Sequence, residues 1–332
     1  MYKMKNILIT GGAGFLGKNL IEELIKMRTT NKIIVLDNFI TSDKRDFVSF
    51  IKNFSEDKVL FYAYDITNSR VIEYLMDDLQ DRDINGIHEI YHLASLASPP
   101  FYKKYPIETL DVGYIGTKNM LEIAKKYNAK ILFSSTSEVY GDAQVSPQHE
   151  EYYGNVNSFG ERSCYDESKR VAEALCYTYL KSYGVDVKIA RIFNTYGPHM
   201  LLNDGRIITE VIRHLKNEST LTIYGDGEQT RSCCYVKDTV RMLVKLMASD
   251  CNDPVNIGNN QERTINNTVN LIENVWNQMF DVNLSVTKLY KPLTQNDPLQ
   301  RKPCLKFNKQ VLGEIEYTSF EEGIKETINY FT

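Results

Sequence analysis

A tyrosine and a lysine four residues apart are the first candidates for chemistry in this sequence. Tyr165 and Lys169 stand in the run YDESK, which continues into RVAEAL, a strongly helix-forming stretch. Residues four apart on a helix project from the same face. A free tyrosine titrates near pH 10, and a neighbouring ammonium would favour the phenolate and lower its pKa. Ordinary helices also contain such pairs by chance, so the rest of the chain must decide.

A glycine-rich turn lies between an apolar run and a helical pattern near the start of the chain. The apolar run covers 5–10, the glycine segment GGAGFLG covers 11–17, and the helical pattern begins at 19. This is the context of a dinucleotide-binding fingerprint, here spaced G-x-x-G-x-x-G. Gly11 permits the tight turn, and Gly14 lets the backbone approach a pyrophosphate at the helix N-terminus. Gly17 lets helix and strand pack closely.

Two acidic residues follow the next expected strands. A buried strand over 33–36 ends in Asp37, and a strand over 59–64 ends in Asp65. A carboxylate at Asp37 would accept the adenosine ribose hydroxyls and repel a 2′-phosphate, which favours NAD over NADP. Asp65 could reach the adenine. The alternative is a glycine turn that binds no nucleotide.

Strands and helices alternate through the first two thirds of the chain. Further strands are expected over 89–95, 130–135 and 187–192, and helices over 71–79, 109–127 and 165–183. This order predicts an α/β fold, a Rossmann-type doubly wound parallel sheet whose ligands lie at the carboxyl ends of the strands.

The last third is richer in loops, with helices expected over 207–216, 236–247 and 265–279. We therefore predict an NAD-binding domain over 1–193, which carries the reactive residues. A smaller mixed α/β substrate lobe is expected over 194–332. The boundary is approximate, and segments of the two parts can interleave.

Composition excludes several classes of partner and site. The net charge of −4 is spread over both signs, which argues against nucleic-acid or membrane-surface binding. No apolar run approaches the length of a membrane span. The six cysteines have no C-x-x-C spacing, so we expect free thiols and no metal site. These features predict a soluble, cytoplasmic protein.

Longer motifs occur along the whole chain. They are HLAS at 92–95, SPP at 98–100, STSEVYGD at 135–142, GERSCYDESKRVAE at 160–173, ARIFNTYGP at 190–198, NDGR at 203–206 and YGDGEQTRS at 224–232. Together with the glycine turn, these motifs resemble those of the extended short-chain dehydrogenase/reductases that act on nucleotide sugars. Among these the similarity is greatest to the UDP-glucuronate decarboxylase (UDP-xylose synthase) family, and it covers essentially the whole chain.

The resemblance implies a carboxy-lyase with tightly bound NAD. Tyr165 would take the proton of the sugar C4 hydroxyl while NAD takes the C4 hydride. Lys169 would lower the pKa of Tyr165 and hold the nicotinamide ribose, and the Thr136 hydroxyl would bind the reacting oxygen. The resulting β-keto acid loses carbon dioxide to an enolate, which needs nearby hydrogen-bond donors. Protonation at C5 and return of the hydride give UDP-xylose.

Three residues are implied near the sugar carboxylate: Glu138, Ser137 and Arg231. A carboxylate facing the substrate carboxylate would destabilise the charged substrate relative to carbon dioxide. Arg231 could hold the substrate carboxylate or position a water that protonates C5. The alternatives are a surface ion pair for Glu138 and a purely diphosphate-binding role for Arg231.

The remaining contacts follow from the same resemblance. The UDP moiety would be held by Asn194, Arg206, Tyr224 and Arg231, although Tyr224 could simply be a packing residue. The expected NAD contacts are Gly11, Gly14, Phe15, Leu16, Gly17, Asp37, Asn38, Thr41, Asp65, Ile66, Leu93, Ser95, Tyr165, Lys169 and Thr195.

Two positions depart from the family pattern, and four other functions stay open. Gly113 stands where asparagine is usual, and His199 where arginine is usual. A sugar 4,6-dehydratase would have an aspartic acid at Ser137, and a 4-epimerase would lack Glu138. A decarboxylase that releases the 4-keto pentose and NADH is a third possibility. A regulator that only binds NAD would not need Thr136, Tyr165 and Lys169 together.

The helices over 109–127 and 165–183 resemble the pair that forms a four-helix dimer interface in this superfamily. We therefore expect a homodimer. Leu175, Tyr179, Met120 and Ile123 are candidates for its interface, with burial inside the chain as the alternative.

Overall fold

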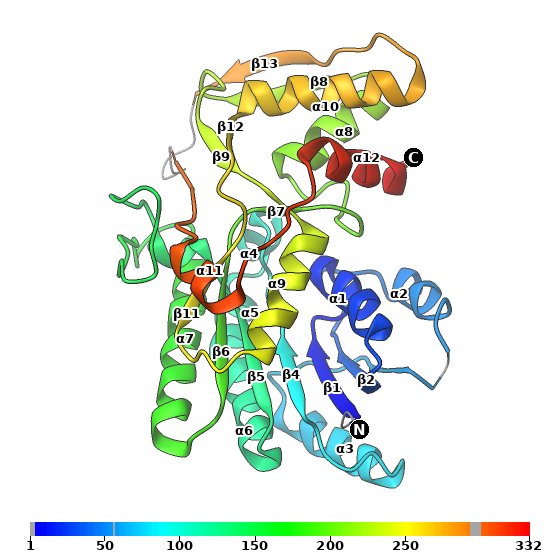
Figure 1. Ribbon diagram of the computed structural model, residues 1–332, viewed down its shortest axis with the longest axis vertical. Helices are drawn as coiled ribbons and strands as arrows, with labels where there is room; N and C mark the ends of the chain where they lie inside the picture. The colour runs from blue at the N-terminus through cyan, green and yellow to red at the C-terminus, as the bar shows by residue number, and fades with distance from the viewer. Residues whose placement is uncertain (1–3, 56, 293–299) are drawn as a thin grey trace.

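Seven parallel strands form the central sheet of the computed structural model, which describes residues 4–55, 57–292 and 300–332 (Figure 1). Their order is β11-β6-β5-β4-β1-β2-β3, and every neighbouring pair is parallel. The predicted doubly wound sheet is confirmed. The strands are β1 (Lys5–Thr10), β2 (Thr30–Leu36), β3 (Val59–Tyr62), β4 (Glu89–His92), β5 (Lys130–Thr136), β6 (Val187–Ile192) and β11 (Pro254–Ile257).

Helices cover both faces of this sheet, as the apolar character of the strands requires. In β1, Ile7 and Ile9 point into one apolar core and Leu8 points into the other. The first face packs against α1 (Phe15–Lys26), α2 (Lys44–Ile51), α9 (Val236–Ala248) and α11 (Lys306–Leu312). The second packs against α3 (Ser69–Asp81), α6 (Thr117–Tyr127) and α7 (Ser163–Tyr183).

The seventh strand, β11, was not expected from the sequence. It pairs with β6 through Val255 and Ala190, and α9 packs on the same part of the sheet. Its four residues, PVNI, are too short a run to stand out between loops. Residues 194–332 therefore do not all lie in the smaller lobe, because the chain leaves the sheet and later returns to complete its edge.

The smaller lobe lies at the top of Figure 1 and is of mixed α/β type. One apolar core runs from the first face of the sheet into this lobe, reaching Leu215, Trp276 and Ile328. The lobe contains α8 (Ile207–Lys216), β8 (Thr220–Tyr224), β9 (Thr230–Ser232), β12 (Glu262–Thr264), α10 (Ile265–Phe280), β13 (Thr287–Lys291) and α12 (Phe320–Phe331). Two short strands, β7 (Thr195–Tyr196) and β10 (Cys234–Tyr235), join it to the sheet.

The long helix expected over 109–127 is built from three segments. After α4 (Pro99–Lys104) come α5 (Pro106–Asp111), a π-helical turn η1 (Val112–Gly116) and α6. A Cβ atom at Gly113 would lie 2.6 Å from Ser168 Cβ and 2.7 Å from its carbonyl oxygen. The absence of a side chain at Gly113 thus lets η1 approach α7 closely. This is a packing role for the departure from the family pattern.

Three of the four side chains proposed for a dimer interface are core residues instead. Met120, Ile123 and Tyr179 are buried between α6, α7 and the sheet, and Leu175 packs against the same cluster. Helical periodicity alone does not tell which apolar face meets the sheet. The apolar side chains that these helices leave exposed are others, including Ile107 and Tyr177.

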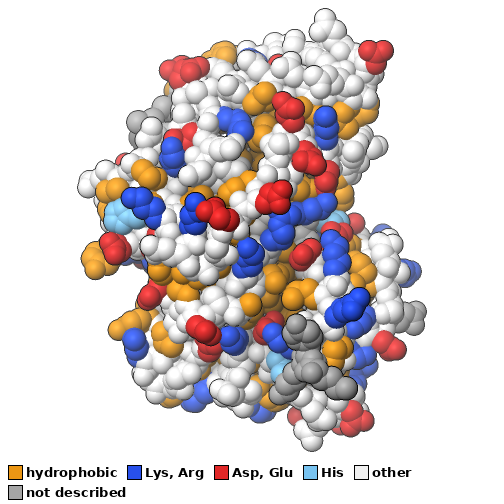
Figure 2. Space-filling model, viewed as in Figure 1, with side chains coloured by type: hydrophobic (Ala, Val, Ile, Leu, Met, Phe, Trp, Pro, Cys, Tyr) orange, Lys and Arg blue, Asp and Glu red, His pale blue; other side chains and the backbone are white. Residues whose placement is uncertain are grey.

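Charged side chains of both signs are interspersed over the face shown in Figure 2. Across the described ranges, no helix has the length and apolar character needed to cross a bilayer.

Candidate active site

One cavity of about 1350 Å³ lies at the carboxyl ends of the sheet strands and continues beneath the smaller lobe. Every site residue predicted from the sequence lines it. These are Gly11, Gly14, Phe15, Leu16, Gly17, Asp37, Asn38, Thr41, Asp65, Ile66, Leu93, Ser95, Thr136, Ser137, Glu138, Tyr165, Lys169, Asn194, Thr195, Arg206, Tyr224 and Arg231.

The glycine turn at one end of the cavity has room for backbone only. Gly11 has φ +69°, and a Cβ there would lie 2.8 Å from the Ala94 nitrogen. A Cβ at Gly17 would lie 2.5 Å from the Gly11 carbonyl oxygen. The turn therefore brings bare backbone and the α1 N-terminus to the cavity, the geometry that receives a pyrophosphate.

Asp37 lies at the end of β2 beside this turn. Its carboxylate accepts hydrogen bonds from the backbone nitrogens of Ala13 (3.0 Å) and Phe39 (2.8 Å) and from the Ser42 hydroxyl (3.1 Å). A carboxylate has about four lone-pair sites, so an acceptor remains for a ribose hydroxyl. The donor set fits NAD, and the carboxylate would oppose the extra phosphate of NADP.

Thr136, Tyr165 and Lys169 come together where β5 meets α7. Tyr165 is only 6% exposed and shares a hydrogen bond with the Thr136 side chain. The Lys169 Nζ donates to the Ser134 carbonyl oxygen (2.7 Å) and lies 5.9 Å from the Tyr165 ring centroid. The tyrosine and lysine project into the same cavity, as their spacing predicted.

The pKa of Tyr165 differs from the expectation. Burial raises it to about 12, with the Thr136 hydrogen bond acting against the rise. Burial also lowers the pKa of Lys169 to about 7. Removal of both groups from water disfavours both charged forms. Residue spacing predicts the attraction between the two groups but not how far the fold removes them from water.

Glu138 lies between two guanidinium groups. Arg162, just before α7, donates to Glu138 Oε2, and Arg301 Nη1 lies 2.7 Å from Oε1. The 3-10 turn η2 (Ser137–Tyr140) carries Glu138, whose backbone nitrogen donates to the Thr136 hydroxyl oxygen (3.3 Å). Because Glu138 is only 8% exposed, it is not a surface ion pair.

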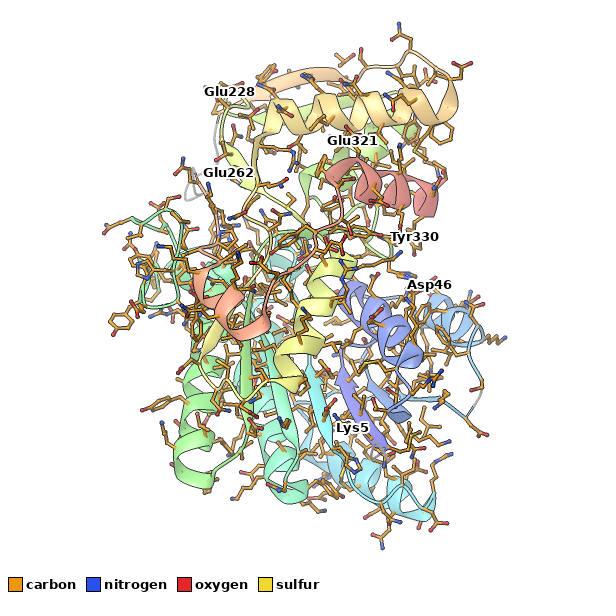
Figure 3. The ribbon with its side chains drawn as sticks, viewed as in Figure 1. Lys5, Asp46, Glu228, Glu262, Glu321 and Tyr330 are labelled. Atoms are coloured by element: carbon orange, nitrogen blue, oxygen red, sulfur yellow. The ribbon has the colours of Figure 1, made fainter. Side chains whose placement is uncertain are left out.

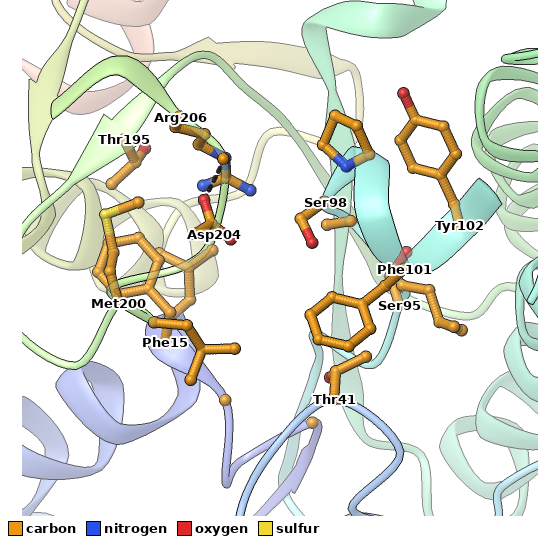
Figure 4. A pocket seen from close by; sticks show the side chains of 18 of the residues that line it. Phe15, Thr41, Ser95, Ser98, Phe101, Tyr102, Thr195, Met200, Asp204 and Arg206 are labelled. Carbon is orange, nitrogen blue, oxygen red and sulfur yellow. Dashed lines mark ion pairs between the residues drawn. The ribbon is translucent and has the colours of Figure 1, made fainter. Parts of the chain in front are cut away.

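The lining residues that the sequence did not predict include Arg162, Arg301 and Tyr102. Arg162 stands inside a quoted motif, three residues before Tyr165, and that position on the same helical face was an available signal. Arg301 had no local signal. Tyr102 and its neighbours Ser98 and Phe101 form the wall that faces Arg206 and Asp204 in Figure 4.

The smaller lobe and its connections supply the other end of the cavity. Arg206 Nε pairs with Asp204 Oδ2 at 3.0 Å (Figure 4). Asn194 lies between β6 and β7, where its carbonyl accepts from Cys234. Tyr224 ends β8 with its side chain half exposed, so it is not a core packing residue. Arg231 reaches the cavity from β9, where it pairs with Arg263 of β12 in the strand register.

His199 occupies the usual arginine position at the junction of the two lobes. Its Nε2 lies 3.3 Å from Glu22 Oε1, and its ring contacts those of Phe50 and Tyr330. Figure 3 shows Tyr330 of α12 close to Asp46 of α2, and both line the cavity.

In the part of the chain that the structure describes, no three His, Cys, Asp or Glu side chains gather as a metal site.

The family model described as "NAD dependent epimerase/dehydratase family" matches residues 7–258. The chain belongs to this family. Its NAD dependence agrees with the cofactor predicted from the glycine turn and Asp37.

Relatives with named activities are similar to this chain over nearly its whole length. UDP-glucuronic acid decarboxylase 1 of Xenopus tropicalis is 44% identical over 327 residues, which is 98% of this chain and 72% of the relative. UDP-glucuronic acid decarboxylase 6 of Arabidopsis thaliana is 42% identical over 318 residues, covering 96% of this chain and 86% of the relative. The resemblance drawn from the motifs is thus confirmed.

Solved structures of nucleotide-sugar epimerases and dehydratases share the fold over nearly the whole chain. A UDP-glucose 4-epimerase from Thermotoga maritima has a TM-score of 0.83 at 28% identity, with 98% of each chain covered. The dTDP-glucose 4,6-dehydratase DesIV from Streptomyces venezuelae, solved with NAD bound, has a TM-score of 0.83 at 22% identity, covering 98% of this chain and 96% of that one. At 22% identity, the similarity to DesIV shows a shared fold and nothing about activity.

Proposed function

We propose that this protein is an NAD-dependent carboxy-lyase that converts UDP-glucuronate to UDP-xylose. The relatives named UDP-glucuronic acid decarboxylase, at 38–44% identity over nearly the full chain, support the substrate and the reaction. The observation that carries the proposal is the buried Glu138 carboxylate, held by Arg162 and Arg301 in the cavity that also contains Tyr165. An acid sugar needs such a charged subsite, and a neutral sugar does not.

The residues around Tyr165 serve the C4 position of the sugar. Bound NAD supplies the reversible oxidation of that carbon. The Tyr165 oxygen takes the proton of the C4 hydroxyl, and the Thr136 hydroxyl holds the same oxygen. Because burial keeps the pKa of Tyr165 at about 12 in the protein alone, the phenolate needs a positive neighbour, which Lys169 and the cofactor provide.

The residues around Glu138 serve the C6 carboxylate. Arg301 and Arg231 hold it in place, and the Glu138 charge keeps the region unfavourable for a second carboxylate. Loss of carbon dioxide from the 4-keto acid removes that repulsion and leaves an enolate. Its oxygen lies with Thr136 and Tyr165, which donate hydrogen bonds to it. Ser137 assists at the carboxylate, and Asn194, Arg206 and Tyr224 hold the UDP part.

The side chains present favour decarboxylation over the two rival reactions. A 4,6-dehydratase needs an acid where this chain has Ser137, which is buried in η2. The resemblance implies that a 4-epimerase would lack Glu138, whereas this chain has the carboxylate, paired with Arg301. Re-reduction of the 4-keto pentose to UDP-xylose is the outcome we propose, because it returns the tightly bound cofactor to NAD for the next turnover.

We also propose a homodimer formed through α5, η1 and α7. Ile107 (64% exposed) and Tyr177 (62% exposed) leave an apolar surface on these helices. Two copies of the segment α5–η1–α6 and of α7 would form the four-helix bundle. The six free cysteines fit a reducing, cytoplasmic compartment.

Residues 1–193 and the returning β11 form the NAD-binding part, and the rest of 194–332 mainly binds the nucleotide sugar.

The decisive experiment combines purified protein, UDP-glucuronate and substoichiometric NAD, followed by NMR and absorbance at 340 nm. UDP-xylose in excess of the added NAD, without lasting NADH, is the expected result. A 4-keto pentose formed one-for-one with NADH would identify the early-release reaction. No turnover of UDP-glucuronate, with NAD bound, would overturn the proposed function and direct the search to epimerase and dehydratase substrates.

A further inference from the structure

A largely buried ion pair between Glu173 and Arg191 lies close to Thr136 and Lys169, outside the cavity. Glu173 Oε1 accepts hydrogen bonds from the Ser135 hydroxyl (2.5 Å) and from Arg191 Nε (3.0 Å), and Oε2 accepts from Arg191 Nη2 (2.8 Å). The two charged side chains are 14% and 12% exposed. A two-pronged Arg–carboxylate pair fixes orientation as well as charge. Neither residue lines the cavity, and neither has a part in the mechanism above.

This pair joins the two elements that carry the C4 chemistry. Glu173 lies one helical turn after Lys169 on α7. Ser135 immediately precedes Thr136 at the end of β5. The bond between Ser135 and Glu173 therefore fixes the strand end against the helix that carries Lys169.

The same network reaches the turn that carries Glu138. Arg191 Nη1 donates to the Tyr140 hydroxyl (3.1 Å), and that hydroxyl donates to Asn256 Oδ1 (2.8 Å) on β11. Tyr140 is the last residue of η2. Asn256 Nδ2 continues the chain of bonds to the Gln148 carbonyl (3.0 Å).

Gln148 in turn holds the segment of Arg301. Its backbone nitrogen donates to the Lys302 carbonyl (2.8 Å), and its Oε1 accepts from the Lys302 nitrogen (2.8 Å). The network that begins at Glu173 thus includes residues adjacent to Thr136 and Arg301, the end of the turn that carries Glu138, and the helix that carries Lys169.

The negative charge of Glu173 also favours the protonated form of Lys169. Lys169 is buried, with the Phe133 and Tyr165 rings and the neutral His92 around it and the Ser134 carbonyl as its hydrogen-bond acceptor. Burial lowers the pKa of Lys169 to about 7, and the Glu173 carboxylate opposes that fall. Among the described side chains that face Lys169 from α7, β4 and β5, the negatively charged one is Glu173.

We propose that Glu173, paired with Arg191, is a positioning residue that sets Thr136, Lys169 and Glu138 relative to one another and stabilises the Lys169 ammonium. This inference rests on the proposed function, because it assigns Glu173 a part in the same reaction. It predicts a loss in turnover that is larger than any loss in substrate binding.

The test compares Glu173→Gln with Glu122→Gln. Glu122 of α6 also accepts a hydrogen bond from an α7 side chain, Tyr179, but it does not contact the network. We expect Glu173→Gln to lower kcat about tenfold to hundredfold with KM for UDP-glucuronate within about twofold. Because the lysine loses its counter-charge, the alkaline limb of kcat moves to lower pH. We expect Glu173→Asp, which keeps the charge, to retain part of the wild-type kcat and the wild-type position of the alkaline limb.

A second readout separates this inference from the proposed function. NADH affinity, measured by fluorescence across neutral and alkaline pH, reports on Lys169 without any sugar turnover. If wild type fails on UDP-glucuronate, the proposed function fails, while a pH shift of NADH binding in Glu173→Gln alone still supports the positioning role. Where Glu173→Gln does not fold, Glu173→Gln/Arg191→Met leaves no unpaired buried charge and carries the same expectation.

Two results overturn the inference. One is a Glu173 variant with wild-type kcat and an unmoved pH limb. The other is an equal loss in Glu122→Gln, which would mean that any weakened α7 contact has the same effect.

Discussion

The rings of Tyr102 and Tyr165 stack with nearly parallel planes, with centroids 5.2 Å apart and an interplanar angle of 11°. Tyr102 comes from α4 and is 1% exposed. Its hydroxyl has no hydrogen-bond partner among the described residues. The stack gives Tyr165 a rigid wall, so the direction of its phenol oxygen depends on a residue far from it in sequence.

Removal of this wall should impair turnover. We expect Tyr102→Leu to lower kcat about tenfold or more, because a loosely held Tyr165 spends less time in the reactive geometry. Tyr102→Phe keeps the stack and serves as the control for the hydroxyl. Steady-state kinetics on both variants would measure the effect, and equal loss in both would assign it to the hydroxyl instead.

Arg301 should contribute to binding of the acid sugar and little to binding of UDP. In Arg301→Leu we expect the affinity for UDP-glucuronate to fall by about 1.5–3 kcal/mol, the range for a hydrogen bond to a charged group. Calorimetric titration with UDP-glucuronate and with UDP gives the two affinities. A parallel fall for UDP would place Arg301 at the diphosphate and count against its carboxylate role.

Asp37 should decide between the two nicotinamide cofactors. Asp37→Asn keeps the hydrogen-bond geometry with Phe39 only in part and removes the charge that repels a 2′-phosphate. We expect NAD affinity to fall about tenfold and the preference over NADP to shrink. Direct binding of both cofactors checks this, and an unchanged preference would show that another group selects NAD.

Gly113 should tolerate no side chain. Its Cβ would lie 2.6 Å from Ser168 Cβ, and the Ser168 backbone cannot move without moving Lys169. We expect Gly113→Ala to destabilise the protein by about 1–3 kcal/mol, the usual cost of overpacking, and to lower kcat. Thermal unfolding and kinetics measure the two effects. Lys118→Ala, on the exposed face of α6, is the matched control.

Asp166 should make stability depend on pH. Burial raises the pKa of Asp166 to about 7, and the nearby Glu138 charge adds to the rise. Between about pH 4 and 7 the folded protein holds a proton that the unfolded chain has released, so stability falls as pH rises through this window. Asp166→Asn should remove this slope and raise stability above pH 7 by on the order of 1–3 kcal/mol. Denaturant titrations at several pH values test it, and a parallel slope in the variant would contradict it.

The parts of the site that sequence alone predicted depend on local geometry. The glycine turn and Asp37 follow from one strand–turn–helix unit and the next strand, whose arrangement fixes where the cofactor lies. Tyr165 and Lys169 lie on the same face of α7 because they are four residues apart in one helix. For these residues, position in the chain and position in space are closely linked.

The parts that sequence did not predict depend on distant contacts. Arg301 reaches Glu138 across a separation of 163 residues. The pKa of Tyr165 depends on how deeply the fold buries it, which periodicity does not give. Strand β11 is recognisable only by its pairing with β6, since four residues carry too little pattern.

The late return of β11 has a consequence for how the chain is synthesised. A nascent chain that has emerged through residue 193 already contains the glycine turn, Thr136, Tyr165 and Lys169, yet the outer side of β6 has no partner strand. Unpaired strand edges recruit other chains. Until residues 254–257 arrive, that edge must be shielded by the ribosome, by a chaperone or by the chain's own helices. Translation pauses made before residues 254–257 have emerged from the ribosome should therefore lower the yield of native protein more than later pauses.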